Sequence, residues 1–291
     1  MARHQTLGHA ARAPRTPEPA MQPRTVLVTG AARGIGLAIA TAFAEAGWNV
    51  GVCDLGASGE AVREVDYALS GDDELQQAVN TLQHAGPGGA LGIATDVTDA
   101  EACTRAVAAA VEHFGAVDLL VNNAGVVTSG PIETVSEADW DRTLAVNTRG
   151  TFLMSQAALR VMAEGAAIIH IASIAGRAGY PNMVPYCTSK FAVMGMMQAM
   201  AAELAPRRIR VNAICPGILG TAMWMEHLLG ATGMDDGSND REARFAELMA
   251  EQIPLGRPQE PADIAEAALY LANAENVTGT AITVAGGLVL G

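Results

Sequence analysis

From Thr25 onward, short apolar and β-branched runs alternate with longer segments of helical period. The runs have the composition of strands and lie at 25–30, 49–53, 91–95, 118–122, 166–172, 208–214 and 281–284. Helical periodicity fills the intervals at about 34–47, 72–84, 98–114, 136–163, 185–205 and 262–272. Thr98 and Glu101 are predicted to form a capping box at the start of the segment 98–114. Strands joined by helical crossovers run parallel. The pattern predicts a single-domain α/β fold with a seven-stranded, parallel, doubly wound sheet and helices on both faces.

Three segments fall outside this alternation. Residues 1–24 carry a net charge of +3, contain four prolines and show no apolar period, which predicts a disordered basic tail before a domain spanning 25–291. The 41 residues between Asp54 and Asp96 exceed what a crossover needs and predict an extra loop or short helix. Residues 222–253 hold a Met- and Leu-rich piece, a Gly/Asp/Asn loop and an amphipathic piece, and we expect them to form a substrate lid.

A glycine-rich stretch, "TGAARGIG", follows the first predicted strand and spans Thr29–Gly36. Glycine at 30, 34 and 36 allows a sharp turn and a close backbone approach to a pyrophosphate, which then lies at the N-terminus of the next helix. The stretch indicates a dinucleotide site on a Rossmann fold, although this spacing is less common than G-x-G-x-x-G and a tight strand-to-helix turn is the alternative.

Asp54 ends the second predicted strand, 18 residues beyond Gly36. A carboxylate there can accept hydrogen bonds from the adenosine ribose and repels a 2′-phosphate, which favours NAD over NADP. The alternative is an ordinary turn residue at a strand end. Arg33 could pair with a 2′-phosphate, face the pyrophosphate or simply face solvent.

The stretch "YCTSK" contains Tyr186 and Lys190, and Lys190 is the one lysine among 18 basic residues. The two residues are four apart in a helical segment, so their side chains project from the same face. A nearby ammonium lowers the pKa of a phenol, which makes Tyr186 a usable general acid or base. Ser173, just past the fifth predicted strand, could orient and polarise a substrate carbonyl, or could cap a turn.

From about Thr25 to Gly291, the chain resembles the short-chain dehydrogenase/reductase family. The resemblance rests on the glycine loop, "DV" at 96–97, "NNAG" at 122–125, Asn147 in "AVNTRG", Ser173 in "IASIAG", "YCTSK", and "CPGILGT". It implies hydride transfer between a nicotinamide and a carbinol carbon, with Asn147, Ser173, Tyr186 and Lys190 as the catalytic set. In that set, Asn147 is implied to hold a water that links Lys190 to solvent. The family also implies a homo-oligomer, a dimer or a tetramer.

The loop, Asp54 and the resemblance together predict the cofactor contacts. These are Gly30, Arg33, Gly34, Ile35, Gly36, Asp54, Asp96, Val97, Asn123, Ala124, Gly125, Tyr186, Lys190, Pro216, Gly217, Leu219 and Thr221. The predicted cofactor is NAD, and no metal site is expected. Of the residues outside this set, His170 is expected to be a satisfied core residue, and Cys187 and Cys215 lack the histidine that a nucleophilic thiol needs.

An apolar cluster of Met223, Trp224, Met225, Leu228 and Leu229 favours a small hydrophobic alcohol or ketone as substrate; the alternative is that these side chains pack on the body of the domain. The 54–96 segment also resembles an insertion in a family subgroup whose NAD stays bound and is recycled by mycofactocin. A different chemistry on the same site, such as dehydration or epimerisation, and a catalytically silent NAD sensor are the remaining alternatives.

Charge and hydropathy limit the partners. The net charge of −13 argues against a nucleic-acid partner. The sequence contains no run of 18 or more apolar residues, so we expect no membrane-spanning helix. Four cysteines without paired spacing fit a reducing cytoplasm best.

Overall fold

A parallel seven-stranded sheet forms the centre of the computed structural model, which describes residues 23–56, 71–220 and 241–290. The strand order is β3-β2-β1-β4-β5-β6-β7, and all six neighbouring pairs are parallel. The predicted fold class is therefore confirmed. The strands are β1 (Thr25–Thr29), β2 (Asn49–Asp54), β3 (Ala90–Ala94), β4 (Leu119–Asn122), β5 (Ala167–Ile171), β6 (Arg210–Pro216) and β7 (Ala281–Val284).

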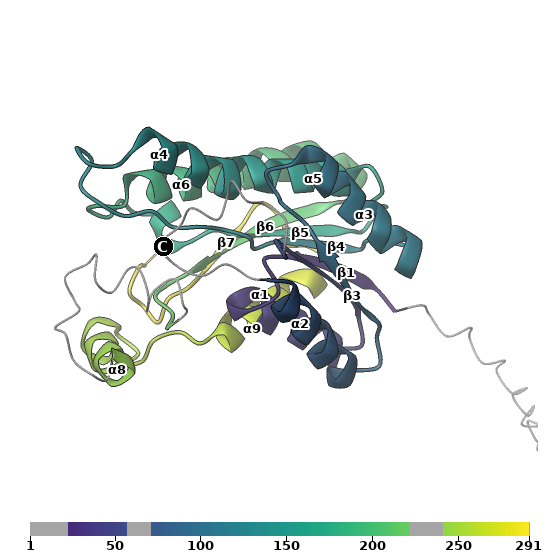
Figure 1. The fold of residues 1–291 in the computed structure, drawn as a ribbon, viewed down its shortest axis with the longest axis horizontal. Coiled ribbons are helices and arrows are strands. Elements are labelled where there is room, and N and C mark those ends of the chain that lie inside the picture. The colour runs from purple at the N-terminus through teal and green to yellow at the C-terminus, as the bar shows by residue number, and fades with distance from the viewer. Residues whose placement is uncertain (1–22, 57–70, 221–240, 291) are drawn as a thin grey trace, which may run out of the picture.

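Helices cover both faces of this sheet (Figure 1). One layer holds α1 (Gly34–Glu45), α2 (Asp72–Ala85) and α9 (Pro261–Asn273). The other holds α3 (Ala100–Phe114), α4 (Glu137–Leu144), α5 (Thr151–Leu159) and α6 (Val184–Leu204). Alternate strand residues enter separate cores, so that in β5 Ile169 packs toward α1 and α9 while Ile168 packs toward α5 and α6. Burial on both faces explains why these strands read as continuous apolar runs.

The strand order reverses beside β1, whose two neighbours are β2 and β4. In open α/β sheets, ligands bind outside the carboxyl ends of the strands at such a switch point. Because the strands are parallel, the loops after β1, β2, β4, β5 and β6 all begin at the carboxyl edge of the sheet. The switch point therefore brings the predicted motifs to one edge of the sheet.

Several predicted boundaries differ from the structure. The predicted helix 136–163 is interrupted by a π-helical turn, Ala145–Gly150, and ends at Leu159. The capping box proposed for Thr98 and Glu101 is wrong, because Asp99 is the N-cap of α3 and its side chain accepts the Glu101 N–H. Thr98 instead donates its N–H and its hydroxyl to Asp96.

The predicted tail and lid lie partly within the described residues. Arg24, the last residue of the tail, lies 3.9 Å from the centre of the Trp48 ring and donates a hydrogen bond to Asn273. Residues 1–22, residues 57–70 of the long crossover, and residues 222–240 of the lid lie outside the described residues. The rest of the predicted lid contains helix α8 (Arg241–Gln252), which packs Phe245 and Met249 against Ile218 after β6. None of the described helices is long and apolar enough to cross a membrane.

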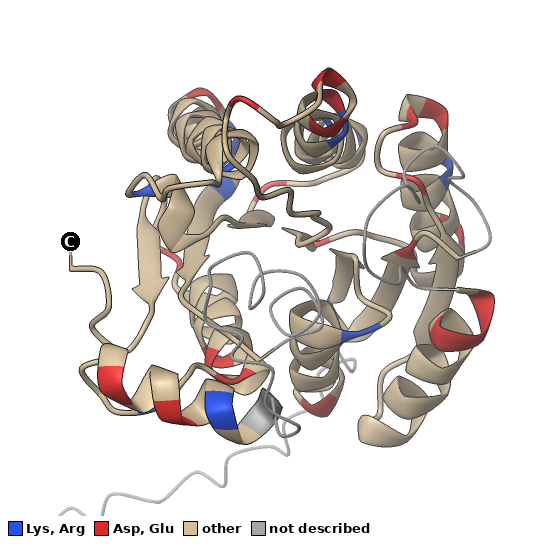
Figure 2. Cartoon of the chain, turned by 60° about the vertical axis from the view of Figure 1, so that its left-hand side comes forward, with Lys and Arg blue, Asp and Glu red and all other residues tan. Residues whose placement is uncertain are grey.

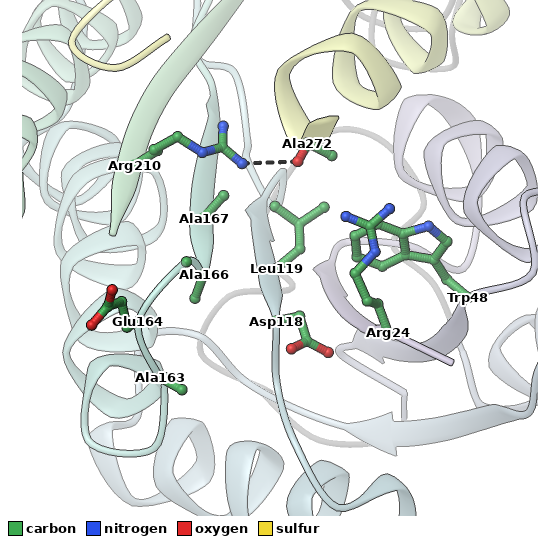
Figure 3. A pocket seen from close by; sticks show the side chains of 11 residues that line it. Arg24, Trp48, Asp118, Leu119, Ala163, Glu164, Ala166, Ala167, Arg210 and Ala272 are labelled. Carbon is green, nitrogen blue, oxygen red and sulfur yellow. Dashed lines mark hydrogen bonds between the residues drawn. The ribbon is translucent and has the colours of Figure 1, made fainter. Parts of the chain in front are cut away.

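Two arginines close the opposite, amino-terminal edge of the sheet, around a pocket of about 160 Å³ (Figure 3). Arg210, at the start of β6, donates to the carbonyl oxygens of Leu271 and Ala272 at distances of 2.6 and 2.8 Å. The last carbonyls of a helix have no partner within the helix, and a cation there also complements the helix dipole. Arg210 and Arg24 therefore anchor the C-terminal end of α9 to the sheet.

We expect Arg210→Met to lower the free energy of unfolding by about 1 to 3 kcal/mol, because two charge-assisted hydrogen bonds to α9 are lost. Urea unfolding followed by circular dichroism measures this change. Arg105→Met is the matched control, because Arg105 is 67% exposed and its ion pairs lie on the surface, where we expect a change below about 0.5 kcal/mol. Equal effects of the two substitutions would contradict the anchoring role of Arg210.

Candidate active site

The glycine loop after β1 has the backbone geometry of a phosphate cradle. Gly30 and Gly34 have φ angles of +63° and +57°, in the left-handed region that favours glycine. A Cβ at Gly36 would lie 2.2 Å from the carbonyl oxygen of Gly30, so only glycine allows this close approach. Gly34, Ile35 and Gly36 open helix α1, whose N-terminus carries unpaired N–H groups and a partial positive charge. The cradle fits the pyrophosphate of a dinucleotide.

The loop after β4 holds this cradle in place. The Asn123 amide donates to the carbonyl oxygens of Thr29 and Gly30 at 2.9 and 2.8 Å. In return, the Thr29 hydroxyl accepts the N–H groups of Asn123 and Ala124, both at 3.0 Å. Both hydrogens of the Asn123 amide are thus used by the glycine loop. Thr29 is a site residue missing from the predicted set, and its position at a strand end beside the glycines is the signal that could have found it.

Asp54 lies at the carboxyl end of β2, next to the glycine loop. Its two carboxylate oxygens accept the N–H groups of Ala32 and Leu55, each at 2.8 Å. An ionised carboxylate has about four acceptor positions, so capacity remains for a ribose diol. Arg33 is partly exposed and is the N-cap of α1.

The loop after β3 contributes Asp96 and Val97. The Asp96 carboxylate is held by Thr98, as described above, and Val97 packs with Val126 and Val146 in a small apolar cluster. Gly150 of the π-helical turn lies against Val97, because a Cβ at 150 would be 2.7 Å from a Val97 methyl. The Val97 side chain is therefore buried, and little of its surface is left for a cofactor.

Lys190 and Tyr186 face each other on helix α6. The Lys190 Nζ lies 5.6 Å from the centre of the Tyr186 ring, and the Lys190 side chain is buried. The ammonium donates to the carbonyl oxygen of Ile171 at 2.9 Å. Burial lowers the pKa of Lys190 to about 8. A Cβ at Gly125 would lie 3.6 Å from this Nζ and 3.3 Å from the Asn147 Oδ1, so Gly125 lies between the two side chains.

Asn147 joins the loop after β4 to α6. Its Oδ1 accepts the Val126 N–H at 2.8 Å, and its Nδ2 donates to the Val126 carbonyl and to the Ser189 hydroxyl, both at 2.9 Å. Both amide hydrogens are used, so this nitrogen has none left to bind a water. The π-helical turn that carries Asn147 corrects the expectation of a mid-helix residue, and such turns often occur at functional sites.

Ser173 follows β5 and caps a one-turn 3₁₀ helix, Ile174–Gly176. The Ser173 hydroxyl accepts the Ala175 N–H at 3.1 Å, so the capping alternative is realised. A hydroxyl that accepts one bond still has its own hydrogen to donate to a substrate oxygen. Gly176 lies against the backbone of α6, because a Cβ there would be 2.8 Å from the Lys190 carbonyl oxygen. This contact brings the Ser173 turn to the helix that carries Tyr186 and Lys190.

The segment after β6 fits the prediction only in part. Pro216 ends β6, and Gly217 lies close to Gln259, since a Cβ at 217 would be 2.3 Å from the Gln259 Oε1. The Leu219 side chain is buried in the core formed with α1 and α9, so a cofactor could reach this residue only through its backbone. Thr221 lies outside the described residues.

His170 is only half satisfied, contrary to expectation. Its Nδ1 lies 3.2 Å from the Asn122 Nδ2, and its Nε2 has no hydrogen-bond partner among the described residues. Burial, followed by the Lys190 charge, lowers the pKa of His170 to about 4. Cys187 and Cys215 are buried free thiols. In the described part of the chain, no three His, Cys, Asp or Glu side chains gather in a way that could hold a metal ion.

Comparison with known proteins agrees with this arrangement. The family described as short chain dehydrogenase matches residues 24–230. A D-threitol dehydrogenase of Mycolicibacterium smegmatis is 38% identical, and a trans-4-hydroxycyclohexanecarboxylate dehydrogenase of Sinomonas cyclohexanicum is 37% identical; both alignments cover 92% of this chain and 93% of the relative. The crystal structure of a carveol dehydrogenase from Mycobacterium avium in complex with NAD is 29% identical, with a TM-score of 0.85 over 92% of this chain and 98% of that one.

We expect Gly36→Ala to weaken dinucleotide binding at least about tenfold, because the new methyl group would displace the carbonyl oxygen of Gly30. Isothermal titration calorimetry with NAD measures this loss. Gly179→Ala is the matched control: a Cβ there has no heavy atom within 4 Å, and we expect affinity within about twofold of wild type. Undiminished binding by Gly36→Ala would refute the assignment of the cradle.

Proposed function

Because the chain belongs to the short chain dehydrogenase family, we propose that it is an NAD-dependent oxidoreductase that interconverts a hydrophobic secondary alcohol and its ketone. Family membership makes it an oxidoreductase of the alcohol dehydrogenase type, acting on CH–OH groups. The observation that carries the proposed mechanism is the buried Lys190 ammonium, 5.6 Å from the Tyr186 ring on the same helix.

The roles of the side chains follow from this pairing. The positive charge of Lys190 favours the phenolate form of Tyr186. Tyr186 then takes the hydroxyl proton in alcohol oxidation and returns it in ketone reduction. Ser173 donates a hydrogen bond to the same substrate oxygen and orients it. A bound nicotinamide supplies the carbon that exchanges hydride with the substrate.

Asp54 supports NAD as the cofactor. Its carboxylate lies beside the glycine loop and retains acceptor capacity for the ribose hydroxyls, while its negative charge repels a 2′-phosphate. Structural relatives have been solved with NAD and with NADPH, so the choice of NAD rests on Asp54 and not on the relatives.

The substrate class is supported by the uncharged segments around the catalytic residues. Neither the stretch 123–130 after β4 nor the stretch 178–186 before Lys190 contains a charged side chain. In Figure 2, the acidic and basic residues lie mainly on the helices, and the strands are almost wholly tan. The relatives include enzymes named for two ring alcohols and one polyol. They support an alcohol as substrate, but they do not favour one class of alcohol over another. The predicted apolar cluster of Met223, Trp224, Met225, Leu228 and Leu229 lies outside the described residues.

We also propose that the protein is a homo-oligomer. Phe152 on α5 and Phe191 on α6 are each 47% exposed in the single chain, and both helices belong to the same layer. Contact with a second copy would remove these large apolar side chains from water.

We expect Tyr186→Phe to reduce hydride transfer by about 100- to 10,000-fold, because the phenol that moves the proton is lost. Absorbance of the reduced nicotinamide, with a panel of cyclic and aliphatic secondary alcohols, measures the rate. Tyr270→Phe, which removes a hydroxyl from the exposed face of α9, should leave the rate unchanged. Lys190→Arg should keep the charge yet lose about 100-fold, because the planar guanidinium cannot occupy the same position. Undiminished transfer by Tyr186→Phe would overturn the mechanism.

We expect the wild type to prefer NAD over NADP by at least about tenfold, and Asp54→Ala to lose most of that preference, because the charge that repels the 2′-phosphate is removed. Steady-state kinetics with both cofactors measures the ratio. Asp73→Ala removes an equal charge from the exposed first turn of α2, away from the glycine loop. This variant should keep the preference for NAD over NADP. A wild-type preference for NADP would contradict the assignment to Asp54.

The same assays test the mycofactocin-linked alternative. That alternative requires purified protein to carry NAD and to fail to turn over with added NAD alone. Rapid turnover with free NAD would exclude it.

A further inference from the structure

Ser189 precedes Lys190 on helix α6, and its side chain has no exposed surface. The proposed reaction uses Tyr186 and Lys190 and leaves this serine without a role. A buried hydroxyl costs free energy unless it is hydrogen-bonded. The Ser189 hydroxyl has two partners, and they belong to different elements of the fold.

The hydrogen bonds around Ser189 have a fixed direction. Its hydroxyl donates its only hydrogen to the Tyr186 carbonyl oxygen at 2.7 Å, because a carbonyl can only accept. The hydroxyl oxygen therefore accepts from the Asn147 Nδ2 at 2.9 Å. The other two bonds of the Asn147 amide go to the N–H and the carbonyl oxygen of Val126. The four bonds form one chain, which runs from the backbone of Val126 through the side chains of Asn147 and Ser189 to the backbone of Tyr186.

The start of helix α6 is held by this chain rather than by a cap. Met183 is the N-cap residue, and its side chain makes no capping hydrogen bond among the described residues. Tyr186 lies in this first turn, and helix ends fray. Thr148, the neighbour of Asn147 in the π-helical turn, donates its hydroxyl to the Ser189 carbonyl oxygen at 3.3 Å. Two successive residues of the π-helical turn thus hold α6 at Ser189.

We propose that Ser189 is a positioning residue: its hydroxyl holds the π-helical turn of Asn147 against the backbone of Tyr186, and so fixes where the Tyr186 phenol lies relative to the loop after β4. That loop also supports the glycine cradle through Asn123. A displacement of about 1 Å in a catalytic group can cost on the order of 100-fold in rate. The consequence for catalysis rests on the proposed function, whereas the hold of Ser189 on Asn147 can be measured without turnover.

A second buried serine, Ser155 on α5, has the same arrangement and serves as the matched control. Its hydroxyl donates to the Thr151 carbonyl oxygen at 2.7 Å and accepts from the Asn122 Nδ2 at 2.9 Å. Ser189 and Ser155 are 0% and 1% exposed, so their burial is equal. A serine that bonds to a carbonyl of its own helix is common, and that bond alone assigns no role. The two sites differ in what they hold, because Asn122 bonds onward to His170, which the proposed reaction does not use.

Ser189→Ala and Ser155→Ala therefore lose equal hydrogen bonds at equal burial, and urea unfolding should show similar losses of stability. In hydride transfer, Ser189→Ala should lower kcat about 10- to 100-fold. Its KM for NAD should stay within about twofold of wild type, because the bonds between Asn147 and Val126 remain. Ser155→Ala should keep kcat within about threefold of wild type. Equal kcat in the two variants, or a Ser189→Ala effect confined to KM, would overturn the proposal.

Hydrogen exchange of side-chain amides tests the same contact without turnover. In ¹⁵N spectra, the Asn147 Nδ2 hydrogens should exchange at least about tenfold faster in Ser189→Ala than in wild type, because one of them loses its acceptor. Ser155→Ala should leave these rates unchanged and should instead speed exchange at Asn122. Unchanged exchange at Asn147 in Ser189→Ala would overturn the proposal.

Two further outcomes are distinguishable. If Ser189→Ala does not fold, wild-type protein decides: its Asn147 side-chain hydrogens should exchange as slowly as those of Asn122, and exchange as fast as at the exposed Asn80 would overturn the proposal. If wild-type protein transfers no hydride, the proposed function fails, and the exchange rates still decide whether Ser189 holds Asn147.

Discussion

The contact between the loops after β1 and β4 is the constraint on which the rest of the site depends. Four hydrogen bonds join Asn123 and Ala124 to Thr29 and Gly30 across the switch point, and these bonds hold two irregular segments at fixed separation. The glycine loop gains its shape from one side of this contact. Gly125, on the other side, leads to Asn147 and Lys190. The proposed cofactor cradle and the proposed proton-transfer site thus share one set of hydrogen bonds, which couples their geometries.

Buried polar groups are concentrated on the α6 side of this contact. Lys190, Asn147 and His170 are all buried, where an unpaired polar group or charge costs free energy. Asn147 avoids this cost with three hydrogen bonds, whereas Lys190 has a main-chain carbonyl and His170 has one amide. The protein therefore carries its least favourable burial at the ammonium on which the proposed chemistry depends. Stability and reactivity are opposed at this position.

Much of the fold could be predicted from the sequence because its signals are local. Apolar runs gave the strands, glycine spacing gave the turn after β1, and a four-residue interval placed Tyr186 and Lys190 on one helix face. The features that were missed depend on contacts between distant segments. Nothing near Asn147 reveals that its amide is occupied by Val126 and Ser189, and nothing near His170 reveals Asn122 beside it. The cap of α3 was misassigned by one residue because Thr98 and Asp99 are both good caps, and the bond between Thr98 and Asp96 decides between them.

The π-helical turn Ala145–Gly150 affects more than Asn147. Such a turn contains about one residue more than an α-helical turn, and each residue of a helix corresponds to a rotation of about 100°. The turn therefore rotates α5 relative to α4 about their common direction and sets which face of α5 meets the sheet. In this orientation, the side chains of Met154 and Ser155 are buried in the interior. Insertions and deletions between residues 145 and 150 would consequently be tolerated far less than the position of this stretch outside the sheet suggests. We expect its length to be the same in all proteins that keep the same inner face of α5.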